Sequence, residues 1–94
     1  MLRIRYSSRF KKDYKAVKRR GYDTRLLEEV LNILSTKQTL PPKYLDHALA
    51  GNYKGYRECH ITPDWLLIYQ YETLDDGEQQ LVCVRTGTHS DFFQ

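Results

Sequence analysis

Two β-strands and the turn between them are predicted by the stretch Gly55-Tyr56-Arg57-Glu58-Cys59-His60-Ile61-Thr62-Pro63-Asp64-Trp65-Leu66-Leu67-Ile68-Tyr69-Gln70-Tyr71. The strands run over Gly55–Ile61 and Trp65–Tyr71, since short runs rich in aromatic and β-branched residues favour strands. Pro63-Asp64 suits the tight connection between them. A third strand is predicted over Leu81–Thr86, after an exposed turn whose Asp76-Gly77 pair is a hairpin signal.

The residues before this sheet predict one more strand and a first helix. Leu2, Ile4 and Tyr6 alternate with two arginines, which indicates a short strand with one buried face. Ser7 or Ser8 can cap the helix that follows, and Gly21 can end it. The apolar face of this helix is formed by Phe10, Tyr14 and Val17.

A second helix is predicted after Asp23 or Thr24, either of which can cap it. Its apolar positions recur at helical spacing: Leu26, Leu27, Val30, Leu31 and Leu34. The element order is therefore β-α-α-β-β-β. We expect one α+β domain over residues 1–94, in two layers, with both helices packed on one face of a mostly antiparallel sheet.

The net charge of +3 hides a strong asymmetry along the chain. Residues 1–40 carry eleven Lys/Arg against four Asp/Glu, whereas residues 41–94 carry four against eight. Most of the excess lies in the first predicted helix, at Arg9, Lys11, Lys12, Lys15, Lys18, Arg19 and Arg20. Such a block suits nucleic-acid phosphates. It equally suits an acidic protein partner, or a solvated helix face.

The two cysteines are too few for a disulfide scaffold and lack the spacing of a metal motif. We expect Cys59 and Cys83 to be reduced packing residues of a cytoplasmic protein. Strand alternation predicts that the two thiols face different sides of the sheet, because Cys83 shares parity with Arg85. We expect no signal peptide, and the longest apolar run is far short of the ~20 residues of a membrane span.

The histidines are the main candidates for chemistry, because only histidine titrates near neutrality without perturbation. Alternation places Glu58 and His60 on one face of their strand. If the helices cover the face of Val82 and Val84, then Arg85 joins Glu58 and His60 on the uncovered face. The flanking candidates are Asp64 in the next turn, His89 just past the last strand and His47 in the preceding loop. An open, polar face of this kind suits an extended polymer.

These groups fit RNA cleavage by the neighbouring 2′-hydroxyl. A pair of histidines can serve as base and acid, each contributing typically ~10²–10⁴-fold. Arg85 can bind non-bridging phosphate oxygens. Asp64 or Glu58 can orient an imidazole and favour its protonated form. The aromatic candidates for stacking on unpaired bases are Tyr53, Tyr56, Phe92 and Phe93.

The chain resembles the YafQ branch of the RelE/ParE superfamily, the toxins of bacterial type II toxin–antitoxin systems. The resemblance covers essentially the whole chain. Its motifs are Asp46-His47-Ala48-Leu49 with Gly51, Tyr53-Lys54-Gly55-Tyr56-Arg57, His60 with Pro63-Asp64-Trp65 and Leu67-Ile68-Tyr69, and Arg85-Thr86-Gly87-Thr88-His89 with a phenylalanine near the end.

The resemblance implies a ribosome-dependent mRNA endoribonuclease that arrests translation without a metal ion or cofactor. Matched position by position, it implies catalytic roles for His47, His60, Asp64 and His89. His89 would be the general acid, His47 or Asp64 the base, and His60 would orient the substrate or stabilise charge. The implied substrate contacts are Arg85 on the phosphate, Phe93 on a base, and Glu58, which stands where family members can carry an aspartate.

The resemblance also implies partners. These are a DNA-binding antitoxin similar to DinJ or RelB, the 70S ribosome and mRNA, with operator DNA contacted only through the antitoxin and no membrane. The ribosome-binding candidates are Lys11, Lys12, Lys15 and Lys18.

Three alternatives remain open at this point. A zinc hydrolase could use the three histidines and Asp64, although the usual ligand spacings are missing. Other members of the superfamily bind DNA gyrase without cutting RNA. Finally, the histidines could be incidental in an accessory domain.

Overall fold

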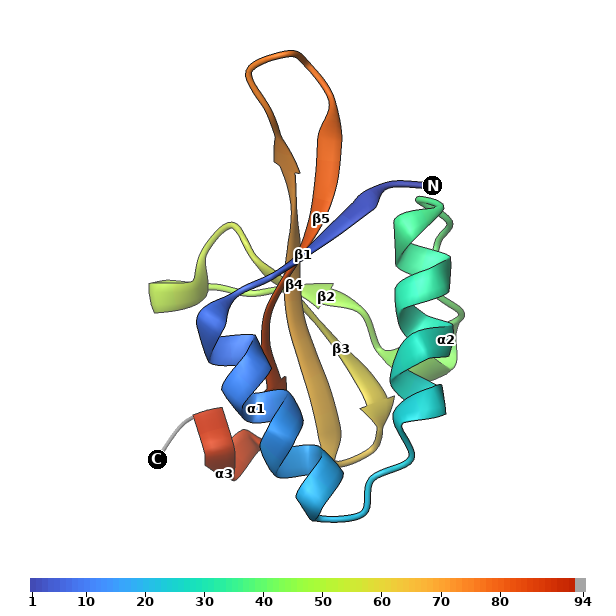
Figure 1. Ribbon diagram of the computed structural model, residues 1–94, viewed down its shortest axis with the longest axis vertical. Helices are drawn as coiled ribbons and strands as arrows, with labels where there is room; N and C mark the ends of the chain where they lie inside the picture. Colours follow the sequence, from blue (N-terminus) through green and yellow to red (C-terminus); the bar gives the residue numbers. More distant parts are fainter. Residues whose placement is uncertain (93–94) are drawn as a thin grey trace.

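A computed structural model describes residues 1–92 and places two helices against one face of a five-stranded sheet (Figure 1). The helices are α1 (Ser8–Arg19), α2 (Thr24–Ser35) and the one-turn α3 (His89–Phe92), with short 3₁₀ turns η1 (Pro42–Tyr44) and η2 (Gly51–Tyr53). The strands are β1 (Arg3–Tyr6), β2 (His47–Ala48), β3 (Arg57–Thr62), β4 (Trp65–Thr73) and β5 (Gln79–Gly87). The predicted α+β architecture is confirmed. Strand β2 and helix α3 were not predicted.

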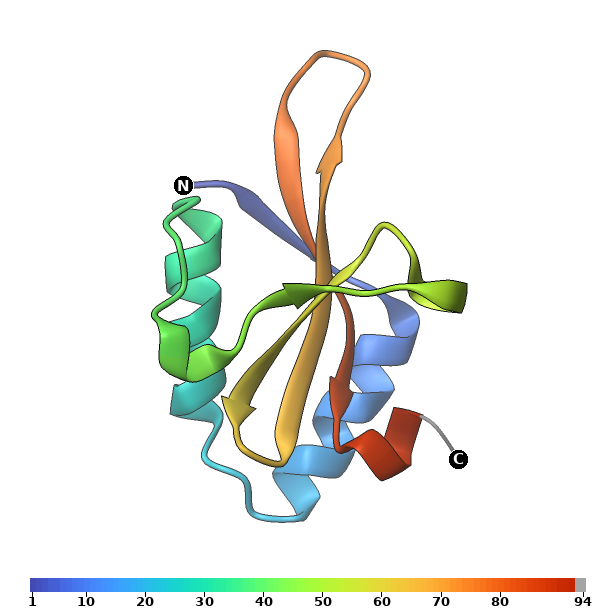
Figure 2. The ribbon, with the colours of Figure 1, turned by 180° about the vertical axis from the view of Figure 1, so that it is seen from behind.

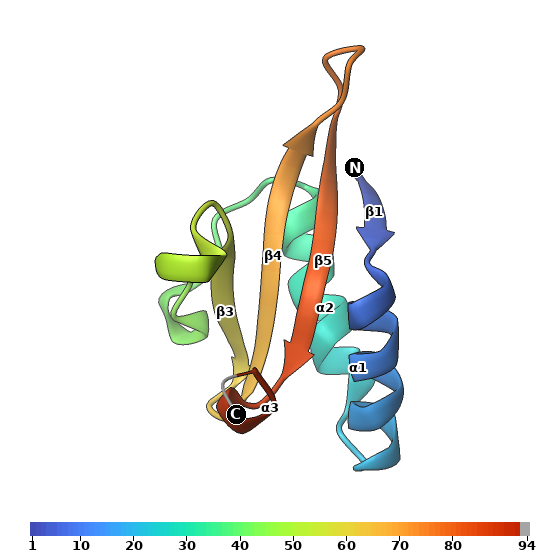
Figure 3. The ribbon, with the colours of Figure 1, turned by 90° about the vertical axis from the view of Figure 1, so that its left-hand side faces the viewer.

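The strands lie in the order β1-β5-β4-β3-β2, and Figure 3 shows β1, β5, β4 and β3 side by side. The neighbours among β2, β3, β4 and β5 are antiparallel, while β1 pairs in parallel with β5. Antiparallel neighbours need only a tight turn between them, as in the β3–β4 connection. The described residues include no helix that is both long enough and apolar enough to cross a membrane.

Both long helices begin and end at residues that satisfy their free backbone groups. The Ser7 hydroxyl accepts the Phe10 N–H at 2.9 Å, and the Asp23 carboxylate accepts the Arg25 N–H at 3.1 Å. After α1, the Tyr22 N–H donates to the Val17 carbonyl at 3.1 Å, and Gly21 takes a φ of +85°. This is a Schellman turn, which favours glycine because the left-handed conformation has no Cβ clash there.

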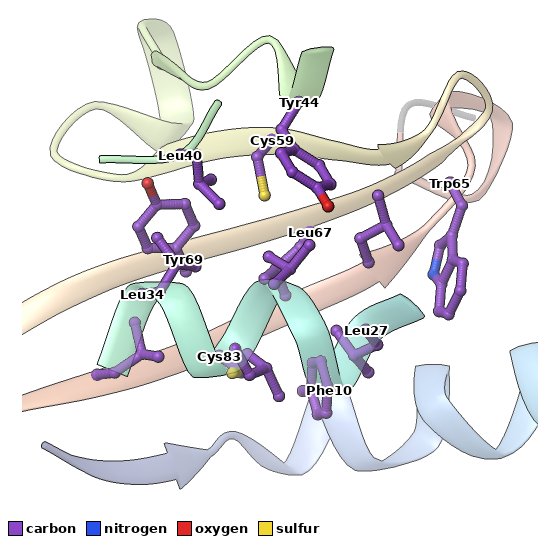
Figure 4. Packing of buried hydrophobic residues seen from close by; sticks show 14 of the residues in the cluster. Phe10, Leu27, Leu34, Leu40, Tyr44, Cys59, Trp65, Leu67, Tyr69 and Cys83 are labelled. Carbon is purple, nitrogen blue, oxygen red and sulfur yellow. The ribbon is translucent and has the colours of Figure 1, made fainter. Parts of the chain in front are cut away.

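The main core lies between the helices and the sheet (Figure 4). Phe10 and Val17 of α1 and the apolar stripe of α2 pack on Cys59, Leu67 and Leu81. Trp65 is 2% exposed, and its indole N–H donates to the buried Thr86 hydroxyl at 2.8 Å. That hydroxyl in turn donates to the Leu66 carbonyl, so the polar atoms in this part of the core are paired.

A β-bulge in β5 overturns two expectations about sheet faces. Tyr69 of β4 pairs with Cys83, but the preceding Ile68 pairs with Arg85, so Val84 is an extra residue on β5. The helices therefore cover the face of Leu81 and Cys83, not that of Val82. Both thiols face the helix side, which makes the prediction of opposite sides wrong. The extra residue places Arg85 on the face opposite Cys83. Arg85 therefore lies on the same face as Glu58, as predicted.

The second face of the sheet is only partly open. Leu66, Ile68 and Val82 lie on it by register, yet all three are buried. The segment from β2 through η2 crosses in front of the longer strands on this side (Figure 2). Helix α3 lies near the end of β5 in the same view. His47 belongs to β2 and His89 to α3, so both histidines lie in the segments on this side of the sheet.

Candidate active site

A row of paired residues runs across four strands on the second face. His47 of β2 pairs with Glu58 of β3, Glu58 pairs with Ile68 of β4, and Ile68 pairs with Arg85 of β5. Residues directly opposite each other in a sheet project to the same face. The row therefore brings one predicted base, one carboxylate and the predicted phosphate-binding cation onto one surface.

Glu58 is the centre of the histidine cluster. Its side chain is 4% exposed, and Oε1 lies 3.5 Å from His47 Nε2 and 3.8 Å from His89 Nε2. The His60 ring centroid lies 6.3 Å from that of His47 and 6.0 Å from that of His89. Three imidazoles from β2, β3 and α3 thus gather around one buried carboxylate.

The second carboxylate oxygen of Glu58 lowers the stability of the fold. Oε2 is buried and has no hydrogen-bond partner among residues 1–92. A buried carboxylate oxygen without a partner is destabilising. The imidazoles are more accessible, since the side chains of His47 and His89 are 48% and 56% exposed. The arrangement is therefore a buried anion beneath accessible groups that can carry protons.

Asp46, the residue before His47, is held in place by contacts with β3 and β4. The Asp46 carboxylate accepts the Tyr69 hydroxyl at 2.6 Å and the Arg57 guanidinium at 3.0 Å. Burial, together with the hydrogen bond to Asp46, raises the pKa of the Tyr69 hydroxyl. Leu45 has a φ of +49°, a left-handed conformation that is uncommon for a residue with a side chain. Its carbonyl oxygen lies 2.8 Å from His47 Nδ1.

Backbone carbonyls also indicate the tautomers of two imidazoles. A carbonyl oxygen only accepts, so Nδ1 of His47 carries the proton that it donates to Leu45. His60 Nδ1 faces the Pro63 carbonyl at 3.4 Å, with the same consequence. In both rings Nε2 is then the nitrogen that can take up a proton from a substrate.

Arg85 is more enclosed than the sequence indicated. Its side chain is 11% exposed, and Nε and Nη2 donate to the Asp13 carboxylate of α1 at 3.1 and 3.0 Å. The Phe92 ring lies 4.9 Å from the guanidinium carbon. Hydrogen bonding to Asp13 raises the pKa of the Arg85 guanidinium, with Tyr53 as a further partner. Any phosphate contact would use a guanidinium that is already held in place.

The remaining predicted residues lie outside the cluster. Asp64 is exposed in the β3–β4 turn, and its carboxylate makes no hydrogen bond or ion pair with the described residues. Phe93 lies outside the described residues. Tyr53 and Tyr56 pack edge-to-face, with their ring centroids 6.2 Å apart. The four predicted ribosome-binding lysines, Lys11, Lys12, Lys15 and Lys18, are all exposed on α1.

Sequence reasoning missed the residues that support the cluster. Asp13 and Asp91 were not singled out, and Arg20 and Asp46 were named only in the basic block and in a family motif, yet each makes a contact next to a candidate site residue. One local signal was available, because Thr88-x-x-Asp91 has the spacing of a helix capping box. Within residues 1–92, no group of three or more His, Cys, Asp or Glu side chains is arranged to hold a metal ion.

This fold and site define a class, the small α+β toxins of bacterial toxin–antitoxin systems. A family model described as "Bacterial toxin of type II toxin-antitoxin system, YafQ" matches residues 2–94. The mRNA interferase toxin YafQ of Escherichia coli K12 is 38% identical over 91 residues, which span 96% of this chain and 94% of that protein. The chain belongs to the YafQ toxin family.

Solved structures agree with this assignment. A metal-bound toxin from Helicobacter pylori is 45% identical and superposes with a TM-score of 0.86, over 99% of this chain and 100% of that one. The toxin in the E. coli DinJ–YafQ complex is 39% identical, with a TM-score of 0.83 and complete coverage of both chains.

Proposed function

We propose that this protein is the toxin of a type II toxin–antitoxin system and acts as a ribosome-dependent mRNA endoribonuclease. The observation that carries the proposal is the buried carboxylate of Glu58, with Oε1 3.5 and 3.8 Å from the Nε2 atoms of His47 and His89. The E. coli relative is named an mRNA interferase. Such an enzyme acts in the cytoplasm, where translating ribosomes are found.

The reaction needs one group to take a proton and another to give one. His47 Nε2 takes the proton of the 2′-hydroxyl, whose oxygen then forms a bond to phosphorus. His89 protonates the 5′-oxygen as the bond from phosphorus to that oxygen breaks. The products are a 2′,3′-cyclic phosphate and a free 5′-hydroxyl. Each proton transfer contributes typically ~10²–10⁴-fold.

Geometry favours His47 over Asp64 as the base. His47 belongs to the cluster around Glu58, whereas Asp64 is exposed and makes no hydrogen bond or ion pair with a histidine among residues 1–92. His60, between the other two rings, orients the substrate or stabilises developing charge. Arg85 contributes positive charge next to the phosphate, and Phe93, which lies outside the described residues, is the candidate for stacking on a base.

Glu58 acts on the imidazoles rather than on the RNA. It is buried, so a nucleotide cannot reach its oxygens without displacing the rings above it. Its negative charge stabilises the imidazolium that forms on His47 and the one that His89 starts from. Glu58 therefore has a supporting role in place of the expected contact with the substrate.

The family supports an antitoxin partner, since a YafQ protein is found in a complex with DinJ. A DNA-binding antitoxin of that kind would neutralise this toxin and connect it to operator DNA. The exposed lysines of α1 can contact either ribosomal RNA or acidic segments of the antitoxin.

Primer extension on a defined mRNA tests the proposal, using wild-type protein and a folded His89→Ala variant with and without programmed 70S ribosomes. We expect cuts only with wild-type protein and ribosomes. Cuts that persist in His89→Ala would keep the nuclease and remove the proposed acid. Activity lost in EDTA and restored by zinc, at a magnesium concentration that keeps the ribosomes intact, would favour a metal hydrolase. Intact RNA with inhibited DNA gyrase would favour the gyrase-binding alternative.

A further inference from the structure

The turn of helix that carries His89 is closed by a reciprocal pair of contacts. The Asp91 carboxylate accepts the Thr88 N–H at 2.8 Å, and the Thr88 hydroxyl accepts the Asp91 N–H at 3.2 Å. This is a capping box, in which residues three apart satisfy each other's free N–H groups at a helix start. His89 is the first residue of α3, so the box sets where its backbone lies.

One turn of helix is not stable in isolation, because nucleation orders several residues for very few hydrogen bonds. Contacts from outside α3 are therefore needed to hold it. Arg20, at the end of α1, supplies two of them: Nη1 donates to Asp91 Oδ2 at 2.8 Å and Nη2 to Oδ1 at 3.0 Å. Two-pronged pairs of this kind fix orientation as well as distance.

The position of Arg20 is itself determined by the Schellman turn at the end of α1. Arg20 is the C-cap residue, and its N–H donates to the Ala16 carbonyl at 3.1 Å. Gly21 follows in the left-handed conformation. The guanidinium therefore projects from a well-defined helix end.

Gly87 shows how closely Asp91 approaches the end of β5. A Cβ built on Gly87 would lie 2.6 Å from Asp91 Oδ2, and its φ is +152°. Both the contact and the conformation require glycine there. Asp91 thus fits against the last residue of β5 while it binds Arg20 and Thr88.

We propose that Arg20 is a positioning residue for His89. Through Asp91, Arg20 holds the helical turn α3 in place and so sets the distance between the His89 imidazole and the Glu58 carboxylate. This inference rests on the proposed function, in which His89 is the general acid. His89 Nε2 lies 3.8 Å from Glu58 Oε1. A shift of about 1 Å in a reacting group can cost on the order of 10²-fold in rate.

The test compares Arg20→Ala and Arg20→Lys with Arg3→Ala, which removes the same charge from an exposed position on β1, outside the basic helix α1. Single-turnover cleavage is measured at saturating programmed ribosomes, with ribosome affinity measured separately. We expect Arg20→Ala to cut about 10- to 100-fold more slowly. Arg20→Lys should recover part of the rate, and Arg3→Ala should keep the full rate. Equal losses in Arg3→Ala and Arg20→Ala, or a loss confined to ribosome affinity, would overturn the proposal.

A double-mutant cycle separates an effect of Arg20 through Asp91 from a general disturbance of the fold. Asp91→Asn retains an oxygen that can accept the Thr88 N–H but removes the charge that Arg20 binds. If Arg20 acts through Asp91, then the double variant Arg20→Ala/Asp91→Asn should be no slower than the slower single variant. Multiplicative losses would show that Arg20 acts by another route.

An NMR readout of His89 keeps this inference distinct from the proposed function. We expect the imidazole resonances of His89 and their pH titration to move in Arg20→Ala and to remain unchanged in Arg3→Ala. If the wild-type protein cuts no RNA, the proposed function fails while the NMR comparison still decides whether Arg20 positions His89. Unchanged His89 resonances in folded Arg20→Ala would refute the positioning role.

Discussion

Arg85 and Asp13 form an enclosed ion pair between β5 and α1, with donor–acceptor distances of 3.1 and 3.0 Å. The same carboxylate accepts the Thr86 N–H at 3.2 Å. Asp13 therefore holds both the side chain of the predicted phosphate-binding cation and the backbone beside it. This contact ties the basic helix to the candidate active site.

Asp13→Ala should lower the free energy of unfolding by about 3 kcal/mol, because it leaves the enclosed Arg85 guanidinium without its carboxylate. Urea unfolding measures the change. Asp75→Ala, at an exposed turn position, should change stability by no more than about 0.5 kcal/mol. Equal stability of the two variants would mean that the Asp13 pair contributes nothing.

Glu58→Gln should separate activity from stability. The substitution removes a buried charge that has one unpaired oxygen, so we expect stability to be unchanged or to rise by up to about 2 kcal/mol. Cleavage should fall by about 10- to 100-fold, since neither imidazolium is then stabilised. Thermal unfolding and single-turnover cleavage are measured on the same preparation, with Glu78→Gln as an exposed control. A destabilised variant with wild-type cleavage would contradict the supporting role of Glu58.

Reversing Lys11, Lys12 and Lys15 to Glu should weaken ribosome binding and flatten its salt dependence. The slope of log affinity against log salt concentration is negative. If each lysine contacts one phosphate, the magnitude of this slope should decrease by about 2. The matched control reverses Lys37, Lys43 and Lys54, which changes the net charge equally but lies outside α1. Identical salt titrations for the two triple variants would remove α1 from the ribosome interface.

The Arg20–Asp91 pair should make a pH-dependent contribution to stability. Hydrogen bonds from Arg20 hold the pKa of the Asp91 carboxyl well below its usual range. A lowered folded-state pKa stabilises the fold fully above the unfolded value of about 3.9, and this contribution is lost as the pH falls through the folded value. The stability difference between wild type and Arg20→Ala should thus be constant from pH 7 to about 5 and shrink below about 4. Urea unfolding across this pH range measures the difference. A difference that grew on acidification would contradict a stabilising role for the pair.

Local patterns were sufficient for much of the fold. Ser7 and Asp23 as helix caps, Gly21 as a helix end and the three long strands were predicted because each depends on residues within a few positions in the chain. Strand alternation placed Glu58 and His60 on one face, whereas His47, which was expected in a loop, joins them through strand β2. Their catalytic roles remain predictions.

Contacts between distant segments required the folded chain. Val84 forms a bulge that places Cys83 and Arg85 on opposite faces, and alternation alone cannot reveal an extra residue. Asp13 meets Arg85, and Arg20 meets Asp91, across more than seventy positions. Periodicity and capping record only the surroundings within one or two turns of chain, whereas these pairs form only because sheet order and helix packing bring α1 beside the end of β5.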